Sequence, residues 1–130
     1  MTAPFHIPAP IVHVIELPLP PSTNALWRSN RNRVHKSAAY EKWIEHANEM
    51  IMCNGGMRGR KTIPGRFKAL IELKRPVANA DLDNRIKAAI DISQQLGLIA
   101  NDKYCMEITA RWSIDAPTGC KLTLTELIGG

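Results

Sequence analysis

The second half of the chain carries a segment of helical periodicity between two segments of alternating polarity, and this arrangement constrains the fold most. Residues 67–74 and 104–113 alternate apolar with polar side chains, which is the period-two pattern of a half-buried strand. Between them, residues 84–96 place apolar side chains at helical spacing, and Gly97 follows where a left-handed residue ends a helix. We therefore expect a strand, a helix and a strand in succession.

The remaining segments complete a small α+β domain. Residues 11–17 are rich in β-branched side chains and predict a first strand, which is followed by a polar loop over residues 20–36. Ser37 can then cap a helix whose apolar positions continue to Ile51. Residues 120–125 alternate again and are expected to form a hairpin with the strand before them. The predicted order is β-α-β-α-β-β: one domain over residues 1–130, with a mixed sheet of about four strands and helices packed on it.

The distribution of charge indicates two kinds of surface. Residues 28–75 hold twelve of the seventeen Lys and Arg but only four of the twelve Asp and Glu. A basic first half and an acidic second half suit a polyanion held beside a cation, although an ordinary solvated surface explains the charges equally well. No apolar stretch is long enough to span a bilayer, and no secretory signal is recognisable. Three cysteines without a CxxC pair predict free thiols in a reducing cytoplasm.

The acidic residues Asp81 and Asp83 flank Leu82 in a segment expected to be extended, so both carboxylates would project the same way. Two adjacent carboxylates repel each other, and a divalent cation relieves that repulsion. Mg²⁺ prefers oxygen ligands and keeps several waters, so two or three carboxylates suffice. Asp102 follows the second helix and a short apolar connector. The chain is expected to turn back there and bring this third carboxylate near the first two.

Lys87 lies one helical turn after Asp83, and Asp91 one turn after Lys87. A lysine beside a carboxylate pair can hold a phosphate oxygen or stabilise charge that develops during phosphodiester cleavage. Each feature also has a structural interpretation. In that interpretation Asp83 caps a helix, Lys87 and Asp91 form a surface ion pair, and the residues around Asp102 form a turn before a strand.

Two polar, basic loops are candidate DNA contacts, because arginine-rich loops can follow a phosphate backbone without reading bases. Trp27 in the first loop either stacks on an unpaired base or anchors the loop. The candidate DNA-binding residues are Arg28, Arg31, Arg33, Lys36, Arg58, Arg60 and Lys61.

Three motifs together resemble the RusA family of Holliday-junction resolvases, which prophages often carry. They are PPSTNALWR at residues 20–28, DLDN at residues 81–84 followed by Lys87, and the segment from Gly97 to Asp102. The resemblance implies a homodimeric endonuclease that nicks the two strands of a four-way DNA junction symmetrically in recombination and repair. It implies that Asp81, Asp83 and Asp102 hold Mg²⁺, with Mn²⁺ as a substitute, and that Lys87 assists catalysis.

Two positions depart from the family pattern, and two other functions remain open. Asn101 stands where many members have a second acidic residue, and residues 77–80 replace the arginine run that some members carry. The first alternative function is a branched-DNA-binding module without catalytic activity. The second is a structure-specific nuclease with another nucleic-acid substrate.

Overall fold

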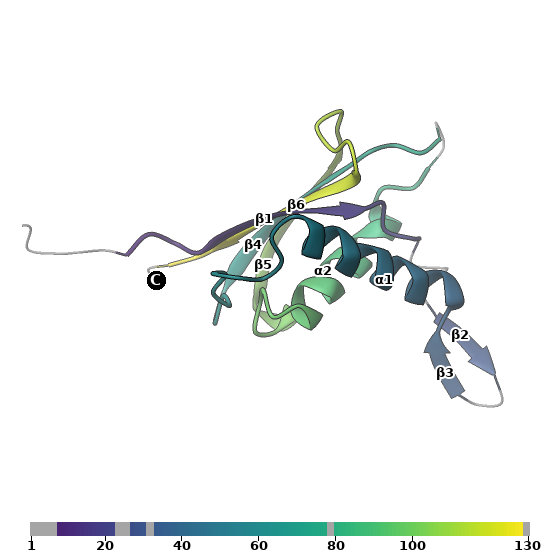
Figure 1. Ribbon diagram of the computed structural model, residues 1–130, viewed down its shortest axis with the longest axis horizontal. Coiled ribbons are helices and arrows are strands. Elements are labelled where there is room, and N and C mark those ends of the chain that lie inside the picture. The colour runs from purple at the N-terminus through teal and green to yellow at the C-terminus, as the bar shows by residue number, and fades with distance from the viewer. Residues whose placement is uncertain (1–7, 23–26, 31–32, 78–79, 129–130) are drawn as a thin grey trace, which may run out of the picture.

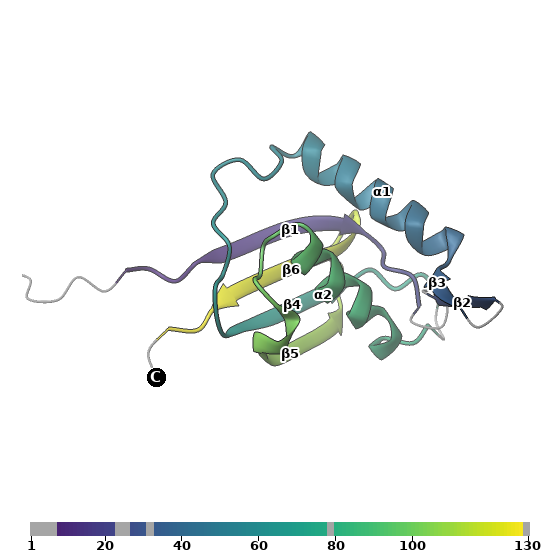
Figure 2. The same cartoon turned by 90° about the horizontal axis from the view of Figure 1, so that it is seen from below.

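A four-stranded mixed sheet forms the centre of the fold, and both helices pack on the same face of it (Figure 1). The computed structural model describes residues 8–22, 27–30, 33–77 and 80–128, without the side chains of residues 27–30 and 33–35. Figure 2 shows the sheet behind the helices, with its strands in the order β1-β6-β4-β5. The elements of this body are β1 (Val12–Pro18), α1 (Ala38–Cys53), β4 (Phe67–Leu73), α2 (Ile86–Gln95), β5 (Cys105–Trp112) and β6 (Gly119–Glu126).

The predicted α+β class is confirmed, but the predicted hairpin of the last two strands is wrong. β5 pairs with β4 in parallel, because α2 carries the chain back across the sheet, and β6 lies between β1 and β4, antiparallel to both. The difference in burial explains why β6, and not β5, lies between β1 and β4. Cys120, Leu122 and Leu124 of β6 are fully buried, whereas Met106 and Ile108 of β5 are about half exposed. The more apolar strand occupies the centre and the less apolar strand forms an edge.

The polar segment expected to be a loop contains a separate two-stranded ribbon. β2 (Trp27–Asn30) pairs antiparallel with β3 (Arg33–Lys36), and the ribbon extends away from the body beside the start of α1 (Figure 1). Periodicity does not detect such a ribbon, because neither of its strands has an apolar alternation that points to a core.

Local signals place α1 and α2 as expected. Ser37 accepts a hydrogen bond from the backbone N–H of Tyr40 at 3.1 Å and caps α1. Trp43 is buried against the sheet and donates from its indole N–H to the carbonyl of Pro18 at 3.0 Å. Gly97 follows α2 with φ +77°, the left-handed conformation that glycine adopts at little cost. Within the described ranges, no helix has both the length and the apolar character needed to cross a membrane.

Candidate active site

The DLDN motif forms a turn rather than an extended segment. Leu82 has helical backbone angles, with φ −73° and ψ −48°, and Asp83–Arg85 form a 3-10 turn (η2) that leads into α2. The prediction that both carboxylates project from an extended segment is therefore wrong. Asp81 and Asp83 are nevertheless both exposed. The side-chain amide of Asn84 donates to Oδ2 of Asp81 at 3.1 Å, which holds one side of the motif.

Asp83 is not the cap of the following helix. The residue at the N-cap of α2 is Arg85, and the residue at the N-cap of the 3-10 turn is Leu82; neither makes a side-chain capping hydrogen bond. The helix-cap interpretation of Asp83 is thus wrong, and its carboxylate lies instead in the first turn before α2, where a negative charge is favourable.

Arg85, which the sequence analysis did not single out, positions the motif. Its Nη1 donates to the carbonyl of Pro20 at 2.7 Å, so the chain that leaves β1 holds the start of α2. Its Nε is buried and has no hydrogen-bond partner among the described residues. The proline-rich segment and the DLDN turn are far apart in sequence but are joined through this side chain.

The middle of α2 carries a charged group that includes Asp91. Lys87 Nζ lies 3.6 Å from Asp91 Oδ1, so the predicted i,i+4 ion pair is present. The hydroxyl of Tyr40 donates to Asp91 Oδ2 at 3.5 Å. Burial and the neighbouring Asp91 carboxylate raise the pKa of Tyr40 to about 12, so the phenol stays protonated and remains a donor. Lys36 Nζ lies 5.9 Å from the centre of the Tyr40 ring, which brings the end of β3 beside this group.

Asp102 lies at the far end of α2. It begins the 3-10 turn η3 (Asp102–Tyr104), which Asn101 caps by accepting from the backbone N–H of Lys103 at 2.9 Å. The backbone N–H of Asp102 donates to Oε1 of Gln94 at 2.9 Å. Asp102 and Asp91, with Gln94 and Gln95, line a hollow of about 250 Å³. The sequence places Asp91 one helical turn after Lys87, whereas the hollow that it shares with Asp102 depends on tertiary packing.

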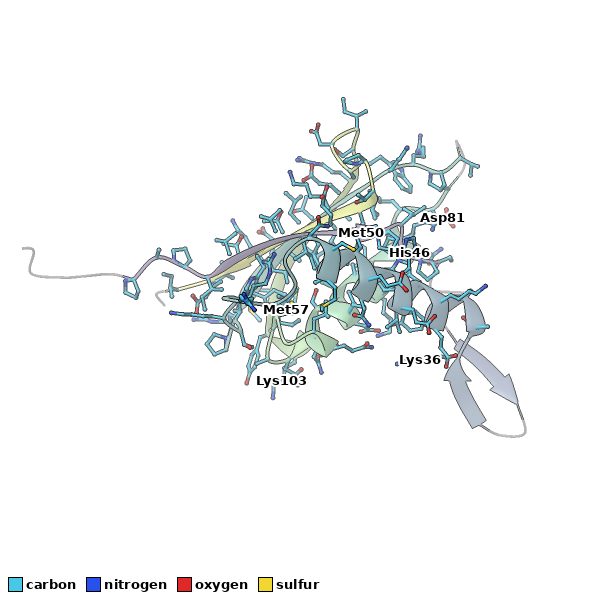
Figure 3. The ribbon with its side chains drawn as sticks, viewed as in Figure 1. Lys36, His46, Met50, Met57, Asp81 and Lys103 are labelled. Atoms are coloured by element: carbon cyan, nitrogen blue, oxygen red, sulfur yellow. The ribbon has the colours of Figure 1, made fainter. Side chains whose placement is uncertain are left out.

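One chain does not bring Asp102 back to Asp81 and Asp83, contrary to the expectation from sequence. The ten residues of α2 rise by about 1.5 Å each, so roughly 15 Å of helix separates its two ends. Figure 3 shows Asp81 towards one end of the molecule and Lys103, the neighbour of Asp102, towards the other. Among the residues that the structure describes, no three His, Cys, Asp or Glu side chains are grouped to hold a metal ion.

The two basic segments lie at opposite ends of α1. The ribbon precedes this sixteen-residue helix and residues 58–61 follow it, a separation of about 24 Å at about 1.5 Å per residue. Arg31 and the side chains of Arg28 and Arg33 lie outside the described residues. Arg58 and Lys61 are exposed.

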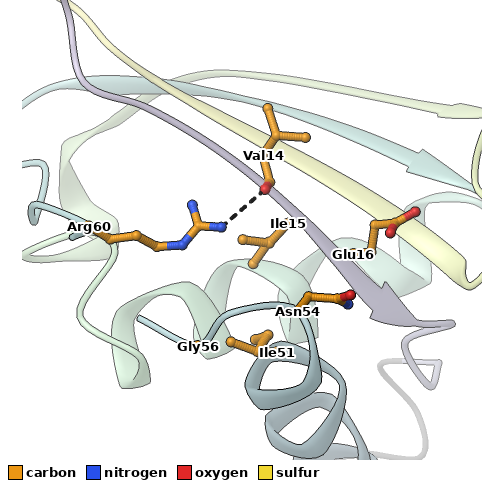
Figure 4. A pocket seen from close by; sticks show the side chains of 7 residues that line it. All are labelled: Val14, Ile15, Glu16, Ile51, Asn54, Gly56 and Arg60. Atoms are coloured by element: carbon orange, nitrogen blue, oxygen red, sulfur yellow. Dashed lines mark hydrogen bonds between the residues drawn. The ribbon is translucent and has the colours of Figure 1, made fainter. Parts of the chain in front are cut away.

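Arg60 makes hydrogen bonds within the chain. Figure 4 shows its guanidinium directed at β1, where it donates to the carbonyl of Val14 at 3.5 Å and to Nδ1 of His13 at 3.4 Å. His13 in turn donates from Nε2 to the carbonyl of Lys61 at 2.7 Å. These contacts fasten residues 58–61 to the free edge of β1. Pairing of Ile63 with Ile99 ties the same loop to the segment before Asp102.

Comparison with known proteins agrees with the motifs. The sequence profile of the family described as Endodeoxyribonuclease RusA matches residues 18–124. Proteins named Crossover junction endodeoxyribonuclease RusA from Escherichia coli O139:H28 (strain E24377A / ETEC), Shigella sonnei (strain Ss046) and Escherichia coli (strain K12) are each 30% identical to this chain. Each alignment spans 115 residues, which are 87% of this chain and 93% of the relative. With a family profile that matches most of its length, the chain belongs to the RusA family of endodeoxyribonucleases.

Proposed function

We propose that the chain forms a homodimer that resolves four-way DNA junctions by paired, symmetric nicks and that it depends on Mg²⁺. The observation that carries this proposal is the exposed turn with Asp81 and Asp83, in a chain whose relatives are named for crossover junctions. These carboxylates cap no helix, and the family supplies a reason for them.

The donor chemistry at the DLDN turn fits Mg²⁺. Asp81 and Asp83 offer charged oxygens on an exposed turn, and Mg²⁺ accepts few protein oxygens while it keeps several waters. When bound, the ion supplies an activated water and charge stabilisation for phosphodiester hydrolysis. Lys87 lies one helical turn from Asp83, and its side chain is about half exposed. We assign Lys87 to holding a phosphate oxygen and stabilising the negative charge that builds up on it.

The third carboxylate of the site is assigned to the partner subunit. Asp102 is separated from Asp83 by the length of α2, so both cannot bind one ion within a single chain. In the proposed two-fold dimer, Asp102 of the partner subunit would approach the DLDN turn, and symmetry would make two such sites. Two identical sites related by a two-fold axis suit two symmetric nicks in a junction that is itself nearly two-fold.

The basic residues are proposed as contacts to the arms of the junction. The first basic segment of the sequence includes Arg28, Arg31, Arg33 and Lys36, and the loop after α1 carries Arg58, Arg60 and Lys61. Because α1 separates the two groups, they would engage phosphates on different stretches of the DNA.

A substrate panel tests the function directly. Purified protein is given four-way, flap, linear duplex and RNA substrates in Mg²⁺, Mn²⁺ or EDTA, and the nicks are mapped on both strands. The proposal expects paired nicks in the four-way junction, and only in the samples that contain Mg²⁺ or Mn²⁺. Tight junction binding without cleavage would instead identify a DNA-binding module, and preferred cleavage of another substrate would identify a different nuclease.

A further inference from the structure

A pocket lies where β4 and β5 end, outside the carboxylate groups described above. It has a volume of about 550 Å³ and is lined by Lys74, Arg75, Trp112, Ser113, Ile114 and Pro117. Small-molecule sites typically measure about 300–1,000 Å³. Figure 1 shows the two segments that follow β4 and β5 leaving the same end of the sheet.

The base of the pocket is held by main-chain hydrogen bonds. The backbone N–H of Ser113 donates to the carbonyl of Leu73 at 2.8 Å, and that of Lys74 donates to the carbonyl of Gly119 at 2.9 Å. Trp112 packs against the hydrophobic core at the edge of the sheet. These contacts hold the indole and the two segments in place before any ligand binds.

The chemistry of the lining combines a cationic side with an apolar side. The Arg75 guanidinium lies 5.3 Å from the centre of the Trp112 ring, and Lys74 is the preceding residue. The apolar side of the lining includes Ile114, whose large side chain is 98% exposed to water. A ligand with a flat apolar surface and an adjoining negative charge satisfies both sides. An unstacked nucleotide has this composition, because bases stack on aromatic rings and on arginine planes.

The pocket is also within reach of the proposed site of cleavage. Six residues lead from Arg75 to Asp81, which span at most about 20 Å when extended. This distance is about half a turn of B-DNA. The pocket and the DLDN turn are therefore close enough for a nucleotide in one and a phosphate at the other to belong to one stretch of DNA.

We propose that this pocket binds one unpaired nucleotide of a branched DNA. The base stacks on the Arg75 guanidinium, which itself lies over the Trp112 ring, and contacts Ile114 and Pro117, while Lys74 contacts the phosphate. The inference rests on the proposed function for its substrate, but it concerns binding and not the metal site.

The test measures binding in EDTA, so that cleavage plays no part. The variants are Ile114→Ser and Arg75→Gln, both at exposed positions, with Met52→Ser and Lys42→Gln on α1 as controls for the same losses of apolar surface and charge. Probes are a four-way junction with 2-aminopurine at the branch, a short single strand and a linear duplex. Ile114→Ser removes apolar surface that the base would cover, so it should weaken junction and single-strand binding at least about fivefold. It should leave duplex binding and the melting temperature near the wild-type values.

The outcomes separate the inference from the proposed function. Equal losses of affinity for all three probes would mean that the pocket contacts only phosphates, and unchanged affinity would mean that it does not contact the DNA. Either result would overturn the proposed nucleotide pocket. A fall in dimer mass for Ile114→Ser, measured by light scattering, would assign the apolar side to a subunit interface and overturn it as well. Selective loss of junction and single-strand binding supports the pocket even if the wild-type protein cleaves no junction, a result that would overturn only the proposed function.

Discussion

Asp83 occupies a position at which many residues would satisfy the local fold. It lies in a 3-10 turn, its side chain caps no helix, and it is exposed. An exposed acidic residue without a capping role is a candidate for function.

The first prediction concerns Asp83→Asn. A neutral amide is a poor ligand for Mg²⁺, so junction cleavage should fall by at least about 100-fold, which corresponds to about 2.7 kcal/mol in the barrier. The melting temperature should stay within a degree or two of wild type, and junction affinity in EDTA should be equal or higher, because a negative charge near the phosphates is lost. Cleavage rate, thermal melting and affinity are measured on the same preparation.

Glu45→Gln on the exposed side of α1 is the matched control for loss of one carboxylate. It should cleave at the wild-type rate. If Asp83→Asn also cleaves at that rate while folding normally, Asp83 is not a metal ligand.

The second prediction concerns His13 and pH. Burial lowers the pKa of His13 below its ordinary value of 6.5, and the positive charge of Arg60 lowers it further. The native histidine thus stays neutral while the unfolded chain takes up a proton. The unfolded state binds more protons between its own pKa and the lowered native pKa, so the free energy of unfolding falls as pH falls below about 6.5.

His13→Gln should reduce this pH dependence, because a glutamine amide can still donate to the carbonyl of Lys61 but does not titrate in this range. Urea unfolding between pH 5 and pH 8 measures the effect. His46→Gln, at an exposed histidine of α1, should retain the wild-type slope. Parallel curves for wild type and His13→Gln would show that another group causes any loss of stability in acid.

At the scale of elements, α2 determines which acidic groups can meet. Its first turn follows the DLDN motif, its middle carries the ion pair of Lys87 with Asp91, and its end is fastened to Asp102 through Gln94. The helix therefore connects the DLDN turn to Asp102 in the chain and holds the two about its own length apart.

The third prediction concerns the start of β6, where Gly119 has φ +121° and lies against the backbone of Leu19. A Cβ on this residue would collide with the Leu19 backbone nitrogen. Gly119→Ala should therefore destabilise the protein by more than the roughly 1–3 kcal/mol of an unfavourable backbone conformation. Chemical unfolding with a fixed denaturant slope measures the change.

Gly59→Ala is the control for backbone conformation without collision, since Gly59 has φ +78° and nothing within 4 Å of an added Cβ. Gly59→Ala should lose only the part of the free energy of unfolding that comes from the unfavourable backbone conformation. Equal losses for the two variants would mean that the approach of Leu19 to β6 has no energetic consequence.

At the scale of the whole molecule, the proposed metal site requires two chains. The protein in solution should have twice the chain mass, and light scattering at concentrations that support cleavage measures it. A monomer that cleaves in Mg²⁺ would exclude the shared site, although a nuclease with a single-chain site would remain.

The fifth prediction uses subunit mixing. Asp83→Asn and Asp102→Asn homodimers should each be inactive, whereas a mixed dimer of the two has one site with all three aspartates and one site with neither Asp83 nor Asp102. Mixed dimers should therefore nick one strand of the junction and leave the opposed strand intact. Strand-specific labels on a four-way junction measure this.

The control for mixing is wild type combined with Asp83→Asn, which should also produce single nicks. If the mixed Asp83→Asn and Asp102→Asn dimers are as inactive as the parents while the control nicks normally, all ligands come from one chain. That chain would then have to change conformation around α2.

Local patterns in the sequence were enough to predict the helices, the β4 strand, the Ser37 cap and the motif that marks the family. Each depends on residues within a few positions of one another, and helical or alternating periodicity reports directly on which face is buried. The same patterns could not order the strands, because β5 and β6 are both alternating and only their competition for the buried centre of the sheet puts β6 between β1 and β4.

Tertiary structure alone decided the geometry of the candidate site. The spacing from Asp83 to Asp102 is compatible with a chain that turns back, but α2 is packed along the sheet and ends beside Gln94, which keeps Asp102 at its far end. The β2–β3 ribbon and the pocket beside Trp112 likewise arise from pairing and packing between segments. Sequence determines which chemical groups are present, whereas the distances between them depend on which surfaces the fold buries together.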